Sequence, residues 1–208
     1  WSLARTGHEL RLHESVIDET NTISPKFIDF AAWPAIGGDH SVSAKDMLNT
    51  VLHSDWILSV ASIANELKIA LAESWNSNSR NNALRNSDLL LQRADPAYAT
   101  RAGHNNVHFL LSLNSMVQTE REYFWECVKP DAELNAIGVY VWYHYSALVK
   151  ASIVANQQLS DKDKNTLILS ALADEAFALH FLEDITASGH LAGTWGKKKK
   201  KKGSHDYY

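Results

Sequence analysis

The end of one predicted helix carries two histidines and an aspartate whose spacing could build a metal site. His180 and Asp184 are four residues apart, so on a helix they share one face, one turn from each other. Leu172 and Ala176 extend the same row, which indicates that this face points into the core. A buried imidazole and carboxylate are costly unless they are paired or metal-bound, and His190, just after a glycine, adds a third group that suits Zn²⁺. The alternative is a buried, hydrogen-bonded His–Asp pair.

The composition predicts one globular domain that spans residues 1–208. Hydrophobic residues make up 45% of the 208 residues and charged residues 21%, which excludes a disordered or collagen-like chain. No apolar run reaches the length of a membrane span, so no transmembrane segment is expected. Nine glycines and four prolines are too few for a turn-rich β-sandwich, and the single Cys127 excludes an intramolecular disulfide.

The charge distribution argues against nucleic acid as the main partner. The formal net charge is −4, but six of the 20 basic residues form the run Lys197–Lys202, so the other 14 face 24 acidic residues. A body this acidic does not favour electrostatic capture of a polyanion. The lysine run itself is either a natural disordered loop or an artificial stretch.

The first residue gives an expectation about localisation. The sequence begins at Trp1 without an initiator methionine, which predicts that a signal or pro-segment has been removed and that the protein is secreted or periplasmic. A secreted protein without a disulfide needs another source of stability, and a bound metal is the obvious candidate.

Hydrophobic periodicity and capping residues predict an all-α, multi-helix bundle. Ser43 with Asp46, and Ser160 with Asp163, have the spacing of helix N-terminal caps. Pro96 is expected to end the helix before it. The predicted helices cover 8–20, 43–72, 86–93, 108–127, 131–158 and 160–184, with a loop containing Pro25, Pro34 and residues 37–39 after the first, and a polar loop over 76–86.

The residues His180, Asp184 and His190 form the pattern H-[F/Y]-L-x-D-x5-H, which resembles the core motif of bacterial zinc-dependent phospholipases C and of the catalytic domains of alpha-toxins. Single-strand-specific zinc nucleases share this motif. In that superfamily the mature chain begins with a tryptophan whose amino group and carbonyl bind zinc, and Trp1 matches this. The resemblance implies the multi-helix fold of that family and a zinc-dependent hydrolase.

The resemblance also implies a site with up to three Zn²⁺ ions. Asp184 would bridge two of them, and the carboxylate that the family places four residues after His205 would fall one residue beyond Tyr208. His13 is an alternative to His8 at one position. The implied metal ligands are Trp1, His8, Asp39, His108, His180, Asp184, His190 and His205.

The family implies a phospholipase C that releases diacylglycerol and a phosphorylated head group from lipids such as phosphatidylcholine at a membrane surface. Asp39 would act as the general base, and His40 either contacts the substrate phosphate or caps the following helix. His53 is expected to be a packed histidine within a helix, and the protein is expected to be a monomer. Two alternatives remain: a single-strand-specific zinc nuclease, and a helical binding protein with structural zinc.

Overall fold

The computed structural model describes residues 11–17, 23–54, 56–98, 100–101, 106–187 and 190. Trp1, His8, His205 and the lysine run lie outside these ranges, and their predicted roles stay predictions. The chain divides into two compact units, residues 1–102 and 103–208. Each unit is described below by itself, and the single catalytic domain over 1–208 stays a prediction.

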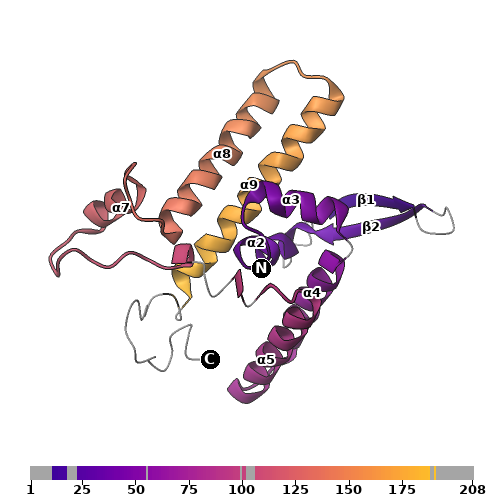
Figure 1. The fold of residues 1–208 in the computed structure, drawn as a ribbon, viewed down its shortest axis with the longest axis horizontal. Helices are drawn as coiled ribbons and strands as arrows, with labels where there is room; N and C mark the ends of the chain where they lie inside the picture. Colours follow the sequence, from indigo (N-terminus) through magenta and orange to yellow (C-terminus); the bar gives the residue numbers. More distant parts are fainter. Residues whose placement is uncertain are drawn as a thin grey trace. The chain divides into compact units, whose positions relative to one another are not determined.

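The predicted all-α class is confirmed. Seven α-helices account for most of the described residues, with two short 3₁₀ helices and one β-hairpin beside them (Figure 1). None of the helices in the described part combines the length and the apolar character that a membrane span requires.

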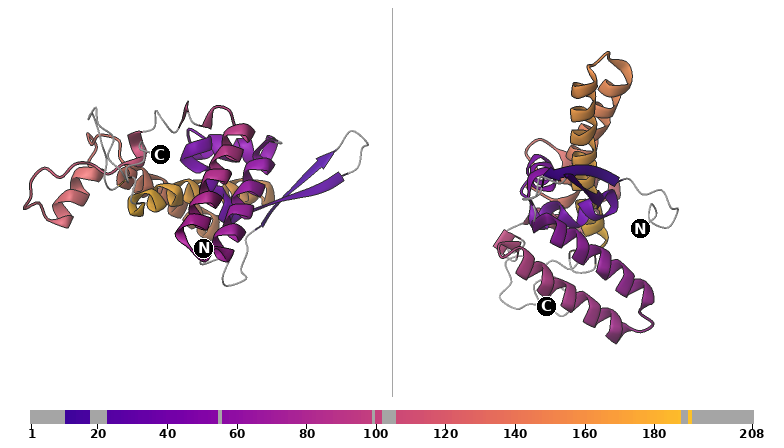
Figure 2. Two further views of the ribbon diagram at one scale, coloured as in Figure 1. Left: turned by 90° about the horizontal axis from the view of Figure 1, so that it is seen from below. Right: turned by 90° about the vertical axis from the view of Figure 1, so that its right-hand side faces the viewer.

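The first element described in the first unit is a strand rather than a helix. Strand β1 (Arg11–Ile17) pairs antiparallel with β2 (Ile23–Asp29), with Leu12 opposite Ile28 (Figure 2). The predicted helix over 8–20 is therefore wrong over its described residues, 11–17. Leu12 and Val16 are four residues apart, which fits one face of a helix, but this even spacing equally fits one face of a strand. The partner strand decides between the two. Pro25 is tolerated in β2 because both strands of a two-stranded sheet are edges.

Residues expected in a loop form a short helix. After η1 (Phe30–Ala32), helix α2 (Trp33–His40) contains Pro34 in its first turn, where the missing N–H of proline costs no hydrogen bond. Gly37 bends α2 with non-helical angles (φ −50°, ψ −127°). The predicted loop over 37–39 is thus wrong. The core of this unit is formed by Trp33, Ile36, Met47, Ile57 and Val60, all fully buried.

The predicted helix 43–72 is two helices. Helix α3 (Ala44–His53) ends at Ser54, whose backbone is extended, and α4 (Trp56–Glu73) follows. The predicted cap is confirmed, because the Ser43 hydroxyl accepts a hydrogen bond from the Asp46 N–H at 3.1 Å. His53 is exposed at the last position of α3, so its expected packing within a helix is wrong.

The asparagine-rich segment after α4 is helical as well. Asn76 caps α5 (Ser77–Ala94) by accepting from the Ser79 N–H at 2.9 Å, and α5 packs on α4. The loop predicted over 76–86 is wrong, because packing against α4 outweighs the low helix propensity of asparagine. The helix ends before Pro96, as predicted.

The second unit is built on a helical hairpin. Helix α8 (Ala136–Asn156) and helix α9 (Asp161–Thr186) lie side by side (Figure 1), and the Ser160 cap of α9 is confirmed by a 3.2 Å bond from the Asp163 N–H. Buried alanines allow the two helices to approach closely: Ala147 of α8 and Ala173 and Ala176 of α9.

Two predicted boundaries in this unit are wrong. The predicted helix 108–127 is reduced to η2 (Asn106–His108) and α7 (Glu120–Val128), because Thr119 and Glu122 form a capping box that starts the helix there. The predicted helix 131–158 begins only at Ala136, because Asn135 caps it. The residues between His108 and α7 are irregular.

Candidate metal centre

Helix α9 presents His180 and Asp184 on its buried face. His180 is 7% exposed and Asp184 8%, and His180 Nε2 lies 3.4 Å from Asp184 Oδ2. Ala176, one turn earlier, is fully buried. The four-residue spacing therefore places both groups as predicted.

Two backbone hydrogen bonds accompany the approach of His190 to the same carboxylate. The Ala187 N–H donates to the Asp184 carbonyl and the His190 N–H donates to the Ala187 carbonyl, both at 3.0 Å. His190 Nδ1 then lies 3.1 Å from Asp184 Oδ1. The two carboxylate oxygens of Asp184 thus face different histidines.

His108 reaches this cluster from 72 residues earlier in the chain. Its Nδ1 lies 2.5 Å from Asp184 Oδ2 and 3.1 Å from His180 Nε2. The next residue is anchored, because the Phe109 carbonyl accepts a hydrogen bond from the Ala136 N–H at 3.0 Å. His108, His180, Asp184 and His190, called here the histidine cluster, thus come together within the second unit, as the resemblance implies.

Aromatic rings enclose the histidine cluster. The Phe181 ring, 1% exposed, has its centroid 5.2 Å from those of both His108 and His180. The Phe109 ring meets the His190 ring edge-on at 5.1 Å. These contacts limit the rotation of the imidazoles and reduce the water around them, which strengthens the electrostatic interactions inside.

Asp184 remains ionised despite its burial. Burial by itself raises the pKa of this carboxyl, but hydrogen bonds from His108 and His190 and the charge of His180 outweigh it. The pKa of Asp184 therefore lies well below its usual range, and the group is a carboxylate at neutral pH.

The facing ring nitrogens of the histidine cluster favour a bound metal cation. His108 Nδ1 and His180 Nε2 face each other, so only one of them can place a proton on the line between them. Two ligand atoms on one tetrahedral zinc ion lie about 3.3 Å apart. The His108–His180 and His180–Asp184 separations of 3.1 Å and 3.4 Å are close to this value, whereas His108 Nδ1 and Asp184 Oδ2, 2.5 Å apart, are at hydrogen-bond distance. The ligand atoms of His108 and His180 are near enough to share an ion. This group of imidazoles and a carboxylate could hold a metal ion.

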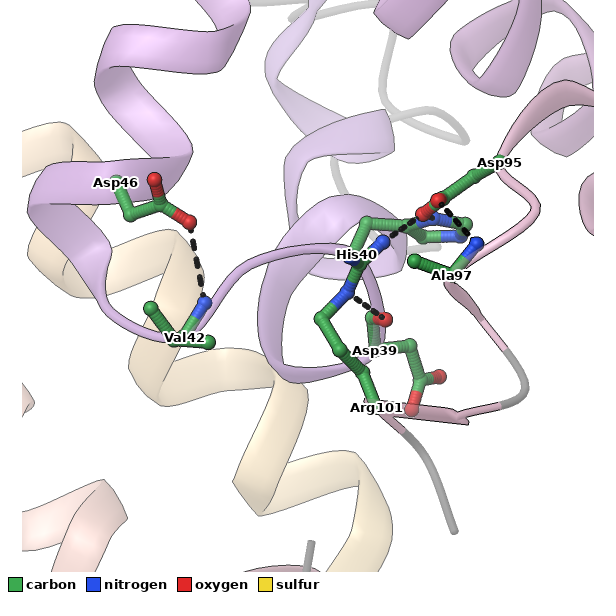
Figure 3. A network of polar contacts seen from close by, with 7 residues as sticks. All are labelled: Asp39, His40, Val42, Asp46, Asp95, Ala97 and Arg101. Atoms are coloured by element: carbon green, nitrogen blue, oxygen red, sulfur yellow. Dashed lines mark hydrogen bonds and ion pairs between the residues drawn. The ribbon is translucent and has the colours of Figure 1, made fainter. Parts of the chain in front are cut away.

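The other two predicted site residues, Asp39 and His40, lie in α2 of the first unit. His40 is 3% exposed, and its Nδ1 lies 2.7 Å from Asp95 Oδ2 (Figure 3). Arg101 forms an ion pair with the same carboxylate and donates from Nε to the Asp39 carbonyl at 3.2 Å. Arg101 therefore ties the residues after α5 to the last turn of α2.

Burial keeps the His40 ring neutral. Burial lowers the pKa of His40, although the hydrogen bond with Asp95 opposes this. The ring stacks on Tyr98 at 4.7 Å, and Nδ1–H donates to Asp95, which leaves Nε2 as the acceptor. A phosphate contact would require Nε2 to carry a proton as well, which burial disfavours. The phosphate-binding role of His40 stays a prediction.

Sequence reasoning missed the partners of His40. Asp95 and Arg101 are 55 and 61 residues away in the chain, and no local spacing links them to α2. The segment Asp95-Pro96 carries only a helix-stop signal. His144 is partly exposed, and its ring stacks on that of Tyr140 with the centroids 5.3 Å apart.

Comparisons with known proteins identify no relative of this chain. Family models, curated proteins and solved structures give no significant match to the chain. The capacity to hold a metal ion thus rests on the geometry of the histidine cluster itself.

Proposed function

We propose that this protein is a zinc-dependent phosphodiester hydrolase of the phospholipase C type, which releases diacylglycerol and a phosphorylated head group. The observation that carries the proposal is the contact of one buried carboxylate, Asp184, with three imidazole nitrogens. Two of these nitrogens also face each other at 3.1 Å. Imidazole nitrogens and a carboxylate oxygen that converge in this way are ligands that a zinc ion accepts.

The residues of the histidine cluster would act as metal ligands, and the rings around them would exclude water. His108, His180 and Asp184 Oδ2 would hold one zinc ion, with Asp184 Oδ1 and His190 available to a second. Zinc bound there supplies a Lewis acid for the phosphodiester and lowers the pKa of a bound water. Phe181 and Phe109 keep bulk water from the histidine rings.

The choice of a phospholipid substrate rests on the resemblance of the 180–190 motif and on the acidic body of the chain. Trp1, His8 and His205 as further ligands, and Asp39 as a ligand and general base, rest on the same resemblance. A polyanionic nucleic acid suits an acidic protein less well than a zwitterionic lipid does.

The experiment measures zinc content together with two hydrolysis reactions. We expect the purified protein to contain at least one zinc ion per chain and to release phosphocholine from phosphatidylcholine vesicles. A chelator should abolish the activity, and added zinc should restore it. His180→Ala should lose zinc and activity, whereas His144→Ala, at a partly exposed histidine paired with Glu175, should keep both.

The other outcomes identify the alternatives. Cleavage of single-stranded DNA without lipid hydrolysis would indicate the zinc nuclease. Bound zinc with neither activity would indicate a structural metal. A folded protein that binds no zinc would overturn the proposal.

A further inference from the structure

We infer that Asn135, a residue outside the histidine cluster, is the positioning residue that holds His108 in place. The inference deepens the proposed function and rests on it for its catalytic consequence. Of the four cluster residues, His108 alone lies neither on α9 nor next to it, so other parts of the chain must fix its position relative to the other three.

His108 lies just before an irregular and largely exposed segment, residues 110–119. The side chains of Leu113, Met116 and Val117 are 58%, 96% and 87% exposed. The middle of this segment provides little packing that could hold its ends. At the end beside His108, Leu110 and Leu111 are half-buried, and the Tyr123 hydroxyl donates to the Leu111 carbonyl at 2.7 Å. The hydrogen bond from the Ala136 N–H to the Phe109 carbonyl joins the start of α8 to the residue that follows His108.

Asn135, the residue before Ala136, uses both the oxygen and the NH₂ group of its side-chain amide. The residue is 1% exposed, and its Oδ1 accepts from the Gly138 N–H at 2.9 Å, which caps α8. Its Nδ2 donates to the carbonyls of Cys127 at 2.9 Å and Glu133 at 2.8 Å. One side chain therefore joins the end of α7, the following loop and the first turn of α8.

The packing at Gly138 shows how tightly these parts are joined. A Cβ atom at position 138 would lie 2.7 Å from the Cys127 carbonyl oxygen and 3.2 Å from Asn135 Nδ2. Real Cβ atoms do not approach backbone this closely, so α7 reaches its position only because residue 138 is glycine.

The Ala136 N–H connects this junction to the metal centre. It is one of the first N–H groups of α8, which have no partner inside the helix, and it is directed at Phe109. Asn135 fixes the direction of that N–H through the cap and through the two carbonyls. Loosening the junction should release Phe109 and let His108 leave Asp184.

The main test compares two N-terminal caps. Asn135→Asp keeps the acceptor for Gly138 but loses both N–H donors and places a carboxylate against two carbonyl oxygens. Asn76→Asp is the matched control, because Asn76 caps α5 through the same Oδ1 contact, at 2.9 Å from the Ser79 nitrogen, on an exposed surface. We expect Asn135→Asp to weaken zinc binding about 10- to 100-fold and to alter the cobalt(II) absorption spectrum, and Asn76→Asp to change neither.

A double-mutant cycle with His108→Ala tests whether the effect passes through His108. We expect Asn135→Asp to weaken zinc binding in the wild-type background and to have no further effect when His108 is absent. Equal weakening in both backgrounds would overturn the inference.

A readout on the metal-free protein separates this inference from the proposed function. The His108 ring proton facing Asp184 at 2.5 Å should give a protected imidazole signal by NMR, retained in Asn76→Asp and lost in Asn135→Asp. If the signal is retained in Asn135→Asp, the inference is wrong, whatever the wild-type protein hydrolyses. If the signal is lost but no lipid or zinc activity exists, only the proposed function fails.

Gly138→Ala provides a second route if Asn135→Asp does not fold. Alanine has a higher helix propensity than glycine, so weaker zinc binding in this variant cannot come from a weaker helix. We expect unchanged helicity with weaker zinc binding and loss of the His108 signal. Wild-type zinc affinity and an intact signal would contradict the proposed junction.

Discussion

Asp184 carries the negative charge of the histidine cluster, and this determines which single substitution should matter most. Both carboxylate oxygens are used, Oδ2 toward His108 and His180 and Oδ1 toward His190. An amide in the same place has the shape of the carboxylate but one oxygen and no charge, so it is a poor metal ligand.

Asp184→Asn should therefore remove more zinc and more activity than His205→Ala, which the resemblance assigns to a single ion. Asp161→Asn, at an exposed aspartate in the first turn of the same helix, is the control and should behave as wild type. Zinc stoichiometry and phosphodiesterase rate would be measured for all three. Full zinc content in Asp184→Asn would show that the cluster is a buried hydrogen-bonded group instead.

His40 should make stability depend on pH in the first unit. Its pKa is lowered by burial, although Asp95 and Asp39 oppose this, while Arg101 adds to it. The unfolded chain therefore binds a proton on His40 at a higher pH than the folded one. The stability that neutral His40 contributes is complete above its unfolded pKa of about 6.5 and is lost as the pH falls through the lower folded pKa.

We expect the free energy of unfolding to decrease less steeply in His40→Gln than in wild type as the pH falls from about 7 to about 5. His53→Gln, at an exposed histidine, should keep the wild-type slope. Urea unfolding at a series of pH values measures both. Identical slopes in all three proteins would contradict a lowered pKa for His40.

At the scale of elements, the α8–α9 hairpin contains a polar contact within its apolar interface. Lys150 of α8 forms an ion pair with Asp174 of α9, and the Ser146 hydroxyl donates to the same carboxylate at 2.5 Å. The Asp174 side chain is 8% exposed and that of Lys150 is 24% exposed. Removal of one partner leaves a partly buried charge, whereas removal of both leaves an apolar contact.

Asp174→Leu should therefore destabilise the protein by about 2–3 kcal/mol, below the range for fully buried pairs because Lys150 reaches water. The double variant Lys150→Leu/Asp174→Leu should recover most of this loss. Chemical denaturation of the single and double variants measures the coupling. The exposed pair Glu126–Lys129 is the control, and its removal should have no measurable effect. Additive costs of the two single changes in the hairpin would contradict the expected coupling.

At the scale of the whole molecule, the candidate metal centre and the His40 network belong to different compact units. The histidine cluster lies entirely within residues 103–208, and His40, Asp95 and Arg101 lie within residues 1–102. The four cluster residues supply enough nitrogen and oxygen atoms for one ion without any residue of the first unit.

A fragment of residues 103–208 should consequently fold and bind one zinc ion, whereas the resemblance implies up to three ions in the full chain. Circular dichroism and metal analysis of the fragment and the full chain, prepared in parallel, give the comparison. A helical fragment that binds no zinc would show that the cluster alone is not a site.

Local signals in the sequence determined the helical class and several helix ends. Ser43 and Ser160 were identifiable as caps because a cap and its partner N–H are three residues apart. His180 and Asp184 were placed together for the same kind of reason, since four residues make about one helical turn. Each of these relations lies within one turn of backbone, where geometry leaves few alternatives.

Tertiary structure decided what the local signals left open. Leu12 and Val16 fit a helix or a strand, and the pairing of β1 with β2 selected the strand. The asparagine-rich α5 is helical because it packs on α4. His108 meets His180 across 72 residues, and Asp95 meets His40 across 55, through contacts that no periodicity encodes. Such contacts depend on how whole elements pack, because packing energy is gained only when distant segments meet, and the sequence near each residue does not contain its partner.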